Sequence, residues 1–244
     1  MVSIEPTLSS PPHCLTNNTM RIITIGDIHQ RLEHCHKIPD LNACDYLLVH
    51  GDLTNFGGRG AVSRVITALR AFRPQVLAQT GNLDRRSGDK FLSEEGINLH
   101  GRARLLQKNH EKLIVIGLGG ANRTFFFTPN EFKEDEMARL LRVAWQEAGE
   151  LMEGGANIPV LLLTHAPPYN TQVDRLKNGR HVGSKAVRAF IEERQPALCV
   201  CGHIHEGKGK DSINATKIIN TGAFFQGGWA DIRVAGGIAS AKLF

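Results

Sequence analysis

The stretch RIITIGDIH, residues 21–29, decides how this chain folds. Its apolar and β-branched run predicts a buried strand over 21–26. The run closes on a glycine, and Asp27 and His29 follow, one residue apart. Such an ending also occurs in ordinary turns, so its meaning depends on whether other strands of the chain end in the same way.

Four further buried strands are predicted, with helices between them. The strands are DYLLVHG at 45–51, QVLAQTG at 75–81, PVLLLTH at 159–165 and ALCVCG at 197–202. Apolar residues recur with helical spacing over 60–72 and 131–152, and Ser184 is placed to cap a third helix that stops before Pro196. Strands that alternate with helices predict an α/β fold.

Two regions depart from that alternation. Residues 97–120 place a polar turn at 109–111 between two strand-like runs, which predicts a hairpin. Residues 216–244 read as three strands with glycines between them. Helices combined with two sets of strands predict two packed mixed β-sheets flanked by helices, a four-layer αββα sandwich.

The length of the chain and the composition of its first residues predict one domain. At 244 residues the chain is long enough for a single large α/β domain, and no linker or repeat divides it. Pro, Ser, Thr and Asn dominate residues 1–19, which predicts a disordered N-terminal extension. The single folded domain is therefore expected over 20–244.

Composition restricts the partners and the compartment. The net charge of +5 comes without a run of Lys and Arg, so no nucleic-acid surface is predicted. No segment has about 18 consecutive apolar residues, so no membrane span is expected. The five cysteines are odd in number and form no CxxC pair, which favours a reducing, cytoplasmic location. Cys199 and Cys201 alternate within a strand and are expected to pack on one face.

Each of the five strands of the α/β alternation ends in polar residues that can bind a metal ion. They are Asp27 and His29, Asp52, Asn82, His165, and His203 with His205. The carboxyl ends of strands meet along one edge in such folds, so these side chains are expected to converge. Two carboxylates, one amide oxygen and four imidazoles suit two borderline divalent ions, Mn, Fe, Zn or Ni, whereas Mg or Ca would require more oxygen ligands.

A pair of such ions indicates phosphoester chemistry. Two carboxylates leave two dications with net positive charge, which favours a phosphate. Paired ions share a bridging hydroxide that is acidic enough to attack at neutral pH, and they hold the phosphoryl oxygens.

The five strand ends also resemble known sequence blocks. GDIH, GDLTNFG, GNLD, THAPP and GHIH, in this order, are similar to the five blocks of the calcineurin-like metallophosphoesterases, and the resemblance runs from Met20 to the C-terminus. GGANRTFFFTPNE, HVGSKAVRAFIEERQP and CGHIHEGKG further resemble a prokaryotic branch, the Icc-related predicted phosphoesterases. The resemblance implies a pair of sheets flanked by helices and a site for two divalent metal ions.

The resemblance also implies how the ligands are divided between the ions. Asp27, His29, Asp52 and His205 would hold one ion, and Asp52, Asn82, His165 and His203 the other, so that Asp52 bridges the two.

The third block departs from the family pattern, in which a histidine stands between the Asn and the Asp. That histidine is thought to stabilise charge on the phosphate or to protonate the leaving oxygen, and Leu83, which stands in its place, can do neither. General-acid help is typically worth about 10²–10⁴-fold in rate. The other parts of the site remain, so catalysis is expected to be weakened and not abolished.

Two further residues are candidates for contacts with the substrate. His181, on the loop after the strand that ends in His165, is a candidate substrate contact and replacement acid. Arg123, which comes shortly after two glycines, is a candidate ligand of a phosphate oxygen. A solvated loop residue is the competing interpretation of each.

These observations lead to a main hypothesis and an alternative. The main hypothesis is a metal-dependent phosphodiesterase that acts on a small nucleotide-like or other activated phosphodiester. The alternative is a metal-binding interaction module with little catalysis, since the retromer subunit of this superfamily is similar in lacking that histidine. A nuclease is not favoured, because relatives that cut DNA usually carry additional domains and no basic stripe is present here. The apolar run 224–232 is interpreted as a packed hairpin, and an interface between copies of the chain stays open.

Overall fold

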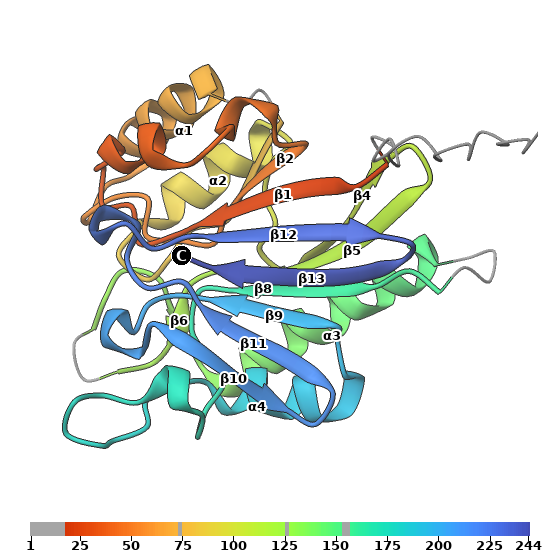
Figure 1. The fold of residues 1–244 in the computed structure, drawn as a ribbon. Coiled ribbons are helices and arrows are strands. Elements are labelled where there is room, and N and C mark those ends of the chain that lie inside the picture. Colours follow the sequence, from red (N-terminus) through yellow and green to blue (C-terminus); the bar gives the residue numbers. More distant parts are fainter. Residues whose placement is uncertain (1–17, 73–74, 125–126, 153–156) are drawn as a thin grey trace, which may run out of the picture.

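The computed structural model describes residues 18–72, 75–124, 127–152 and 157–244. Two large sheets pack face to face, and helices cover the outer face of each, as Figure 1 shows. The predicted α/β sandwich of two mixed sheets is therefore confirmed. Most of the predicted N-terminal extension, residues 1–17, lies outside the described residues.

The first sheet has five strands in the order β13-β12-β1-β2-β3. These strands are β1 (Met20–Ile25), β2 (Tyr46–Val49), β3 (Val76–Ala78), β12 (Ala230–Ala235) and β13 (Ile238–Leu243). β1, β2 and β3 run parallel, whereas β12 is antiparallel to both of its neighbours. Helices α1 (Arg59–Phe72) and α2 (Arg86–Glu94) pack on the outer face of this sheet.

The second sheet has six strands in the order β10-β11-β9-β8-β5-β4. They are β4 (Arg102–Lys108), β5 (Glu111–Leu118), β8 (Val160–Thr164), β9 (Leu198–Cys201), β10 (Gly209–Ile213) and β11 (Thr216–Asn220). The four central strands are parallel and the two edge strands are antiparallel to them. Helices α3 (Glu134–Leu151) and α4 (Lys185–Arg194) cover its outer face, and β6 (Ala121–Asn122) pairs with β7 (Glu131–Phe132) beside it.

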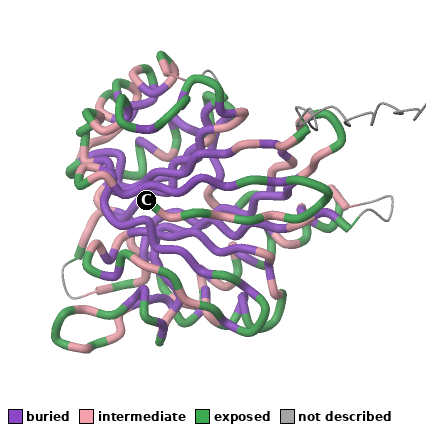
Figure 2. The backbone as a smooth tube through the Cα atoms, viewed as in Figure 1, coloured by how far each residue is buried: buried purple, intermediate pink, exposed green. Residues whose placement is uncertain are grey.

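Strand alternation divides the core into three layers. Ile22 and Leu48 of the first sheet share one buried cluster with Leu163 and Val200 of the second, and this cluster lies between the sheets. Their strand neighbours face the helices instead. Because both faces of the central strands are covered, most of their residues are apolar, and Figure 2 shows these strands as the most continuously buried part of the chain.

The structure confirms the prediction for the two cysteines of β9. Cys199 and Cys201 are buried in the cluster under α3 and α4, whereas Val200 between them faces the other sheet. Burial raises the pKa of the Cys199 thiol to about 12. Both thiols are therefore packing groups.

The five predicted strands, the three predicted helices and the 97–120 hairpin are all present, with ends that differ by a few residues. Ser184 caps α4, since its hydroxyl accepts a hydrogen bond from the amide N–H of Val187. The three C-terminal strands divide between the sheets, β11 joining the second and β12 and β13 the first. The run 224–232 packs inward, with Phe224 and Trp229 buried, but it forms a short 3-10 turn and the start of β12 and not a hairpin of its own.

Helix α2 was not predicted. Its sequence, RSGDKFLSE, is mostly polar, and its buried side chains are Phe91 and Leu92. Two adjacent apolar residues give no helical period to detect.

Among the described residues, no helix has the length and apolar character needed to cross a membrane.

Candidate metal centre

The carboxyl ends of β1, β2, β3, β8 and β9 lie on the same side of the two sheets, at the left of Figure 1. All seven predicted ligands lie in the segments that follow these ends. Asp27, His29, Asp52 and His203 have left-handed backbone, with φ between 46° and 65°. This conformation costs a non-glycine residue on the order of 1–3 kcal/mol and clusters at functional sites.

Asp27, His29 and His205 form the first potential ligand group, with one ligand atom of each within 4.8 Å of the others. His205 donates a hydrogen bond from Nε2 to Asp27 Oδ1 at 3.1 Å. His29 donates from Nδ1 to Asn55 Oδ1 at 2.7 Å, which fixes the ring so that Nε2 faces the group. That Nε2 atom is buried and has no hydrogen-bond partner among the described residues.

Asp52, Asn82 and His165 form a second group beside the first. His165 Nε2 lies 2.9 Å from Asn82 Oδ1 and 3.5 Å from Asp52 Oδ1. The Asn82 amide donates to Thr128 Oγ1 at 3.0 Å, so that its oxygen points at the site. His165 Nδ1 donates to the carbonyl oxygen of His50 at 3.2 Å, which aims Nε2 at Asp52 and Asn82.

His203 and Asp27 connect the two groups. The main-chain N–H of His203 donates to Asp27 Oδ2 at 3.0 Å, and the His203 ring centroid lies 5.0 Å from that of His165. A Cβ atom at Gly202 would overlap Asp27 Oδ2, so the β9 loop approaches this carboxylate as closely as it does only because residue 202 is glycine.

The electrostatics of the site suit a cation. Burial works against ionisation of Asp27, but the hydrogen bond from His205 and the positive charge of His165 outweigh it and hold the pKa of Asp27 well below its usual value. Burial lowers the pKa of His203 to about 4, so that this imidazole is neutral. His165 and His205 carry raised pKa values, that of His165 about 9, because nearby carboxylates outweigh the effect of burial.

The donor set therefore fits divalent metal ions. Carboxylate oxygens, imidazole nitrogens and an amide oxygen are suitable ligands for borderline ions. The buried Nε2 atom of His29 has no hydrogen-bond partner among the described residues, so it is available to a metal ion. The raised pKa values of His165 and His205 mean that protons occupy positions that a metal ion could take instead.

Comparison with known proteins agrees with this geometry. Residues 20–207 match the calcineurin-like phosphoesterase family. The chain belongs to this family. Its members are phosphoesterases that use divalent metal ions, and the resemblance expected from the five sequence blocks is confirmed.

The matches to individual relatives cover most of the chain. The uncharacterized protein MJ1162 of Methanocaldococcus jannaschii is 34% identical over 206 residues, covering 82% of this chain and 87% of that protein. TT1561 of Thermus thermophilus has a similar fold, with a TM-score of 0.64, 16% identity and coverage of 92% of this chain and 99% of that one. The phosphopantetheinyl hydrolase of Mycobacterium tuberculosis has a TM-score of 0.55, 15% identity and coverage of 82% and 88%.

Leu83, where the family pattern has a histidine, contributes its main chain to the site. Its N–H donates to Asp52 Oδ1 at 2.8 Å, while its side chain is half-buried. The neighbouring Asp84 is buried and accepts hydrogen bonds from the main-chain N–H groups of Leu53, Thr54 and Gly81. Asp84 thus holds the loop after β2 against the loop after β3, a role that needs no histidine at position 83.

His50 is a part of the site that the sequence interpretation missed. It is fully buried, and a Cβ atom at Gly26 or Gly202 would overlap its ring, so the ring lies between the ends of β1 and β9. Its Nε2 atom is 3.0 Å from Thr221 Oγ1 at the end of β11. One of its ring nitrogens lies within 4.8 Å of ligand atoms of Asp27 and His165. His50 therefore supports several of the strand ends that carry candidate ligands.

Replacing His50 with alanine should weaken metal binding by about 10–100-fold, the usual effect of losing an outer-shell support. Removing the His50 ring would leave a cavity between Gly26 and Gly202, and the two loops that carry the candidate ligands could then shift into it. Metal affinity is measured by titration calorimetry of the metal-stripped protein. Leu69→Ala, a core truncation on α1, serves as the control that lowers thermal stability alone. Equal metal affinity in His50→Ala and wild type would contradict this role.

Metal affinity should rise with pH up to about 9. With its pKa at about 9, His165 is protonated in the metal-free protein at neutral pH, and a metal ion must displace that proton. Each displaced proton changes the apparent affinity by about tenfold per pH unit below the pKa. Calorimetry in buffers of different ionisation enthalpy counts the protons released. Affinity that stays constant between about pH 6.5 and 8.5, below that pKa, would show that His165 is not a ligand.

The two predicted substrate contacts differ in their relation to the candidate ligands: Arg123 lies in a pocket next to them, whereas the partners of His181 do not include any of them. Arg123 is exposed and lines a pocket of about 290 Å³ with Thr128, the residue that accepts the Asn82 hydrogen bond, so this pocket adjoins the second ligand group. His181 donates from Nδ1 to the buried Asp174 at 2.7 Å and lies edge-on to Tyr169. Neither partner of His181 is a candidate metal ligand.

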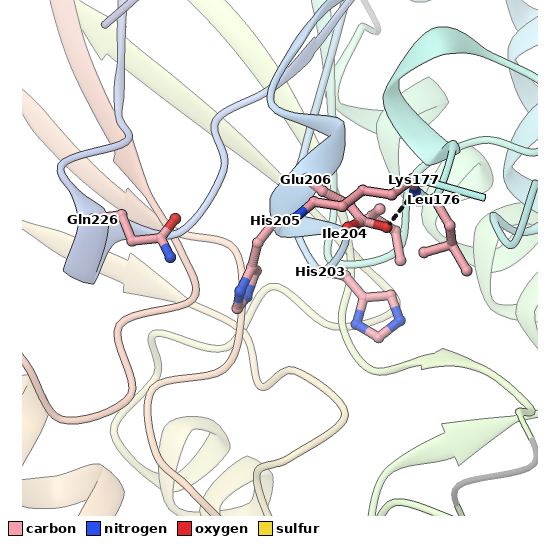
Figure 3. A pocket seen from close by; sticks show the side chains of 7 residues that line it. All are labelled: Leu176, Lys177, His203, Ile204, His205, Glu206 and Gln226. Atoms are coloured by element: carbon pink, nitrogen blue, oxygen red, sulfur yellow. Dashed lines mark hydrogen bonds between the residues drawn. The ribbon is translucent and has the colours of Figure 1, made fainter. Parts of the chain in front are cut away.

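Two further pockets open beside His205. The larger, about 520 Å³, is lined by Leu176, Lys177, His203, Ile204, His205, Glu206 and Gln226, as Figure 3 shows. The Lys177 main-chain N–H donates to Glu206 at 2.7 Å across its wall. The smaller, about 280 Å³, is lined by His29, Arg31, Asn55, His205 and Phe225. Candidate metal ligands therefore form a wall of both pockets.

Proposed function

We propose that this chain is a phosphodiesterase that uses two divalent metal ions to hydrolyse a small, activated phosphodiester. The convergence of carboxylates, imidazoles and an amide from five strand ends carries the proposal. Asp27, His29, Asp52 and His205 would hold one ion, and Asp52, Asn82, His165 and His203 the other. Bound metal ions of this kind acidify water into an attacking nucleophile and neutralise phosphoryl oxygens.

The protein's own contribution is to fix its ligands before substrate arrives. Asn55 orients His29, Thr128 orients Asn82, and the Leu83 N–H holds Asp52. Because these partners are already in place, little reorganisation is needed during the reaction.

The preference for diesters is inferred from Leu83. A leaving alkoxide of high basicity needs a proton, and the side chain at position 83 has none to give. Diesters with a good leaving group depend least on that proton. We propose Arg123 as a contact for the phosphate or its substituent, since its pocket adjoins Asn82 through Thr128. His181 is proposed as a second contact, with Asp174 orienting its ring.

A substrate comparison tests this function. The chain is stripped of metal, reloaded with Mn, Fe, Zn or Ni, and assayed with bis-p-nitrophenyl phosphate and p-nitrophenyl phosphate, while elemental analysis of the native protein identifies its metal. We expect hydrolysis in the loaded protein alone, faster for the diester. A protein that binds two metal equivalents and hydrolyses neither compound would instead support the interaction-module alternative.

A further inference from the structure

The pocket formed by His29, Arg31, Asn55, His205 and Phe225 has a chemistry unlike that of its neighbour; we name it the Phe225 pocket. The half-buried Phe225 ring is edge-on to His29 and His205, with centroids 5.4 Å and 5.6 Å away. The Arg31 guanidinium lies 5.2 Å from the centre of the same ring. One aromatic side chain and one planar cation thus stand directly beside two candidate metal ligands.

We propose that the Phe225 pocket binds the base of a nucleotide whose phosphate lies at the metal centre. The inference rests on the function proposed above and specifies its substrate class. A nucleobase is planar, so it can stack on the Phe225 ring or on the Arg31 guanidinium. The Asn55 oxygen is occupied by His29, and its side-chain NH₂ group adds hydrogen-bond donors at the wall for the polar edge of a base.

Arg31 is free to meet a ligand. Its ion-pair partner is Glu33, at 3.7 Å, and both side chains are more than half exposed, at 56% and 66%. An exposed pair of this kind contributes little, so the guanidinium can leave it for a stacked base at small cost.

Other substituents fit the pocket less well. An acyl chain or other alkyl group could contact Phe225 but would leave the Arg31 guanidinium and the Asn55 amide without a polar partner, whereas a base can use all three. The larger pocket, which is also lined by His205, has Lys177, Glu206 and Gln226 in its wall, and these side chains suit a polar second substituent on the phosphate. A nucleotide phosphodiester could therefore place its nucleoside in the Phe225 pocket and its second substituent in the larger pocket.

Binding measurements test the proposal apart from catalysis. Adenosine 5′-monophosphate and ribose 5-phosphate carry the same phosphate and sugar, and only the first has a base. Titration calorimetry of the manganese-loaded full chain should give tighter binding of the nucleotide by about tenfold or more. Phe225→Leu should remove this preference and Phe225→Tyr should retain it. Arg31→Ala should reduce it, while Arg142→Ala, an exposed arginine on α3, should leave it unchanged.

Two results would overturn the proposal: equal affinity for the two compounds in the wild type, or a preference that survives both Phe225→Leu and Arg31→Ala. Failure of the proposed function would look different. In that case the loaded protein would hydrolyse neither aryl phosphate, whatever its affinity for the nucleotide.

Discussion

Replacing Asp52 with asparagine should abolish metal-dependent phosphodiester hydrolysis. Asp52 is buried at 3% exposure, and its Oδ1 atom accepts the Leu83 N–H while lying 3.5 Å from His165 Nε2. In the proposed centre this carboxylate bridges both ions, so the asparagine amide removes the one negative charge that the two ions share. Loss of an outer-shell partner costs about 10–100-fold, and loss of a shared ligand should exceed the upper end of that range.

The same substitution has a readout that needs no metal. The negative charge of Asp52 is the principal influence that raises the pKa of His165 against burial. In metal-free Asp52→Asn, the His165 pKa should therefore fall, which an NMR titration measures. The asparagine oxygen can still accept the Leu83 N–H, so the fold should be retained.

Asp231→Asn is a matched control for this experiment. Asp231 is also a buried carboxylate, at 8% exposure, and it pairs with Arg21 and Arg233 in the first sheet. Its loss should lower thermal stability without changing the rate of the loaded enzyme. If Asp52→Asn keeps more than a tenth of the wild-type activity while Asp231→Asn behaves as expected, the bridging role is wrong.

The sequence predicts the strands and the edge at which they end because both depend on local patterns. A run such as PVLLLTH is apolar on both faces, and this property identifies a strand covered on both sides. The polar residues directly after these runs, including His165, then meet wherever parallel strands end together. Seven candidate ligands could therefore be named without knowledge of any contact between them.

The supporting residues could not be found in this way. Asn55 holds His29 across 26 positions and Thr128 holds Asn82 across 46, and neither follows a strand directly. His50 directly follows the apolar strand β2, so in the sequence it resembles a residue that only packs in the core. Its supporting role becomes visible only in the structure, where Gly26 and Gly202 lie against its ring. The Phe225 pocket likewise joins residues 29, 31, 55, 205 and 225, which no sequence period relates.

The two kinds of residue differ in how they are constrained. A metal ligand needs a particular atom at the end of a strand, so its type and its place are both visible in the sequence. An orienting residue needs only some donor or acceptor at the right point in space, which many side chains could supply from many positions. Leu83 belongs to the second case, since the site uses its main-chain N–H, which any residue except proline would provide.

Replacing Leu83 with histidine should raise monoesterase activity relative to diesterase activity. A proton donor matters most for a poor leaving group, so an alkyl monoester should gain more than bis-p-nitrophenyl phosphate. General-acid catalysis typically contributes about 10²–10⁴-fold. The structure favours the lower end, because both oxygens of Asp84 are already occupied and cannot readily turn to orient a new imidazole.

The Asp84 carboxyl gives a second reason to expect a modest gain. Burial and the nearby charge of Asp52 raise the pKa of Asp84 to about 7. Near neutral pH this carboxyl is therefore ionised in only part of the molecules, and it stabilises the positive charge of an imidazolium at position 83 only in part. The ratio of the two kcat/KM values is the quantity to measure, with Leu83→Phe as the control that adds a ring without a proton. The histidine variant should also acquire a basic limb in its pH profile, where the new acid loses its proton. A ratio that falls below that of the wild type would show that the missing proton donor does not set the substrate preference.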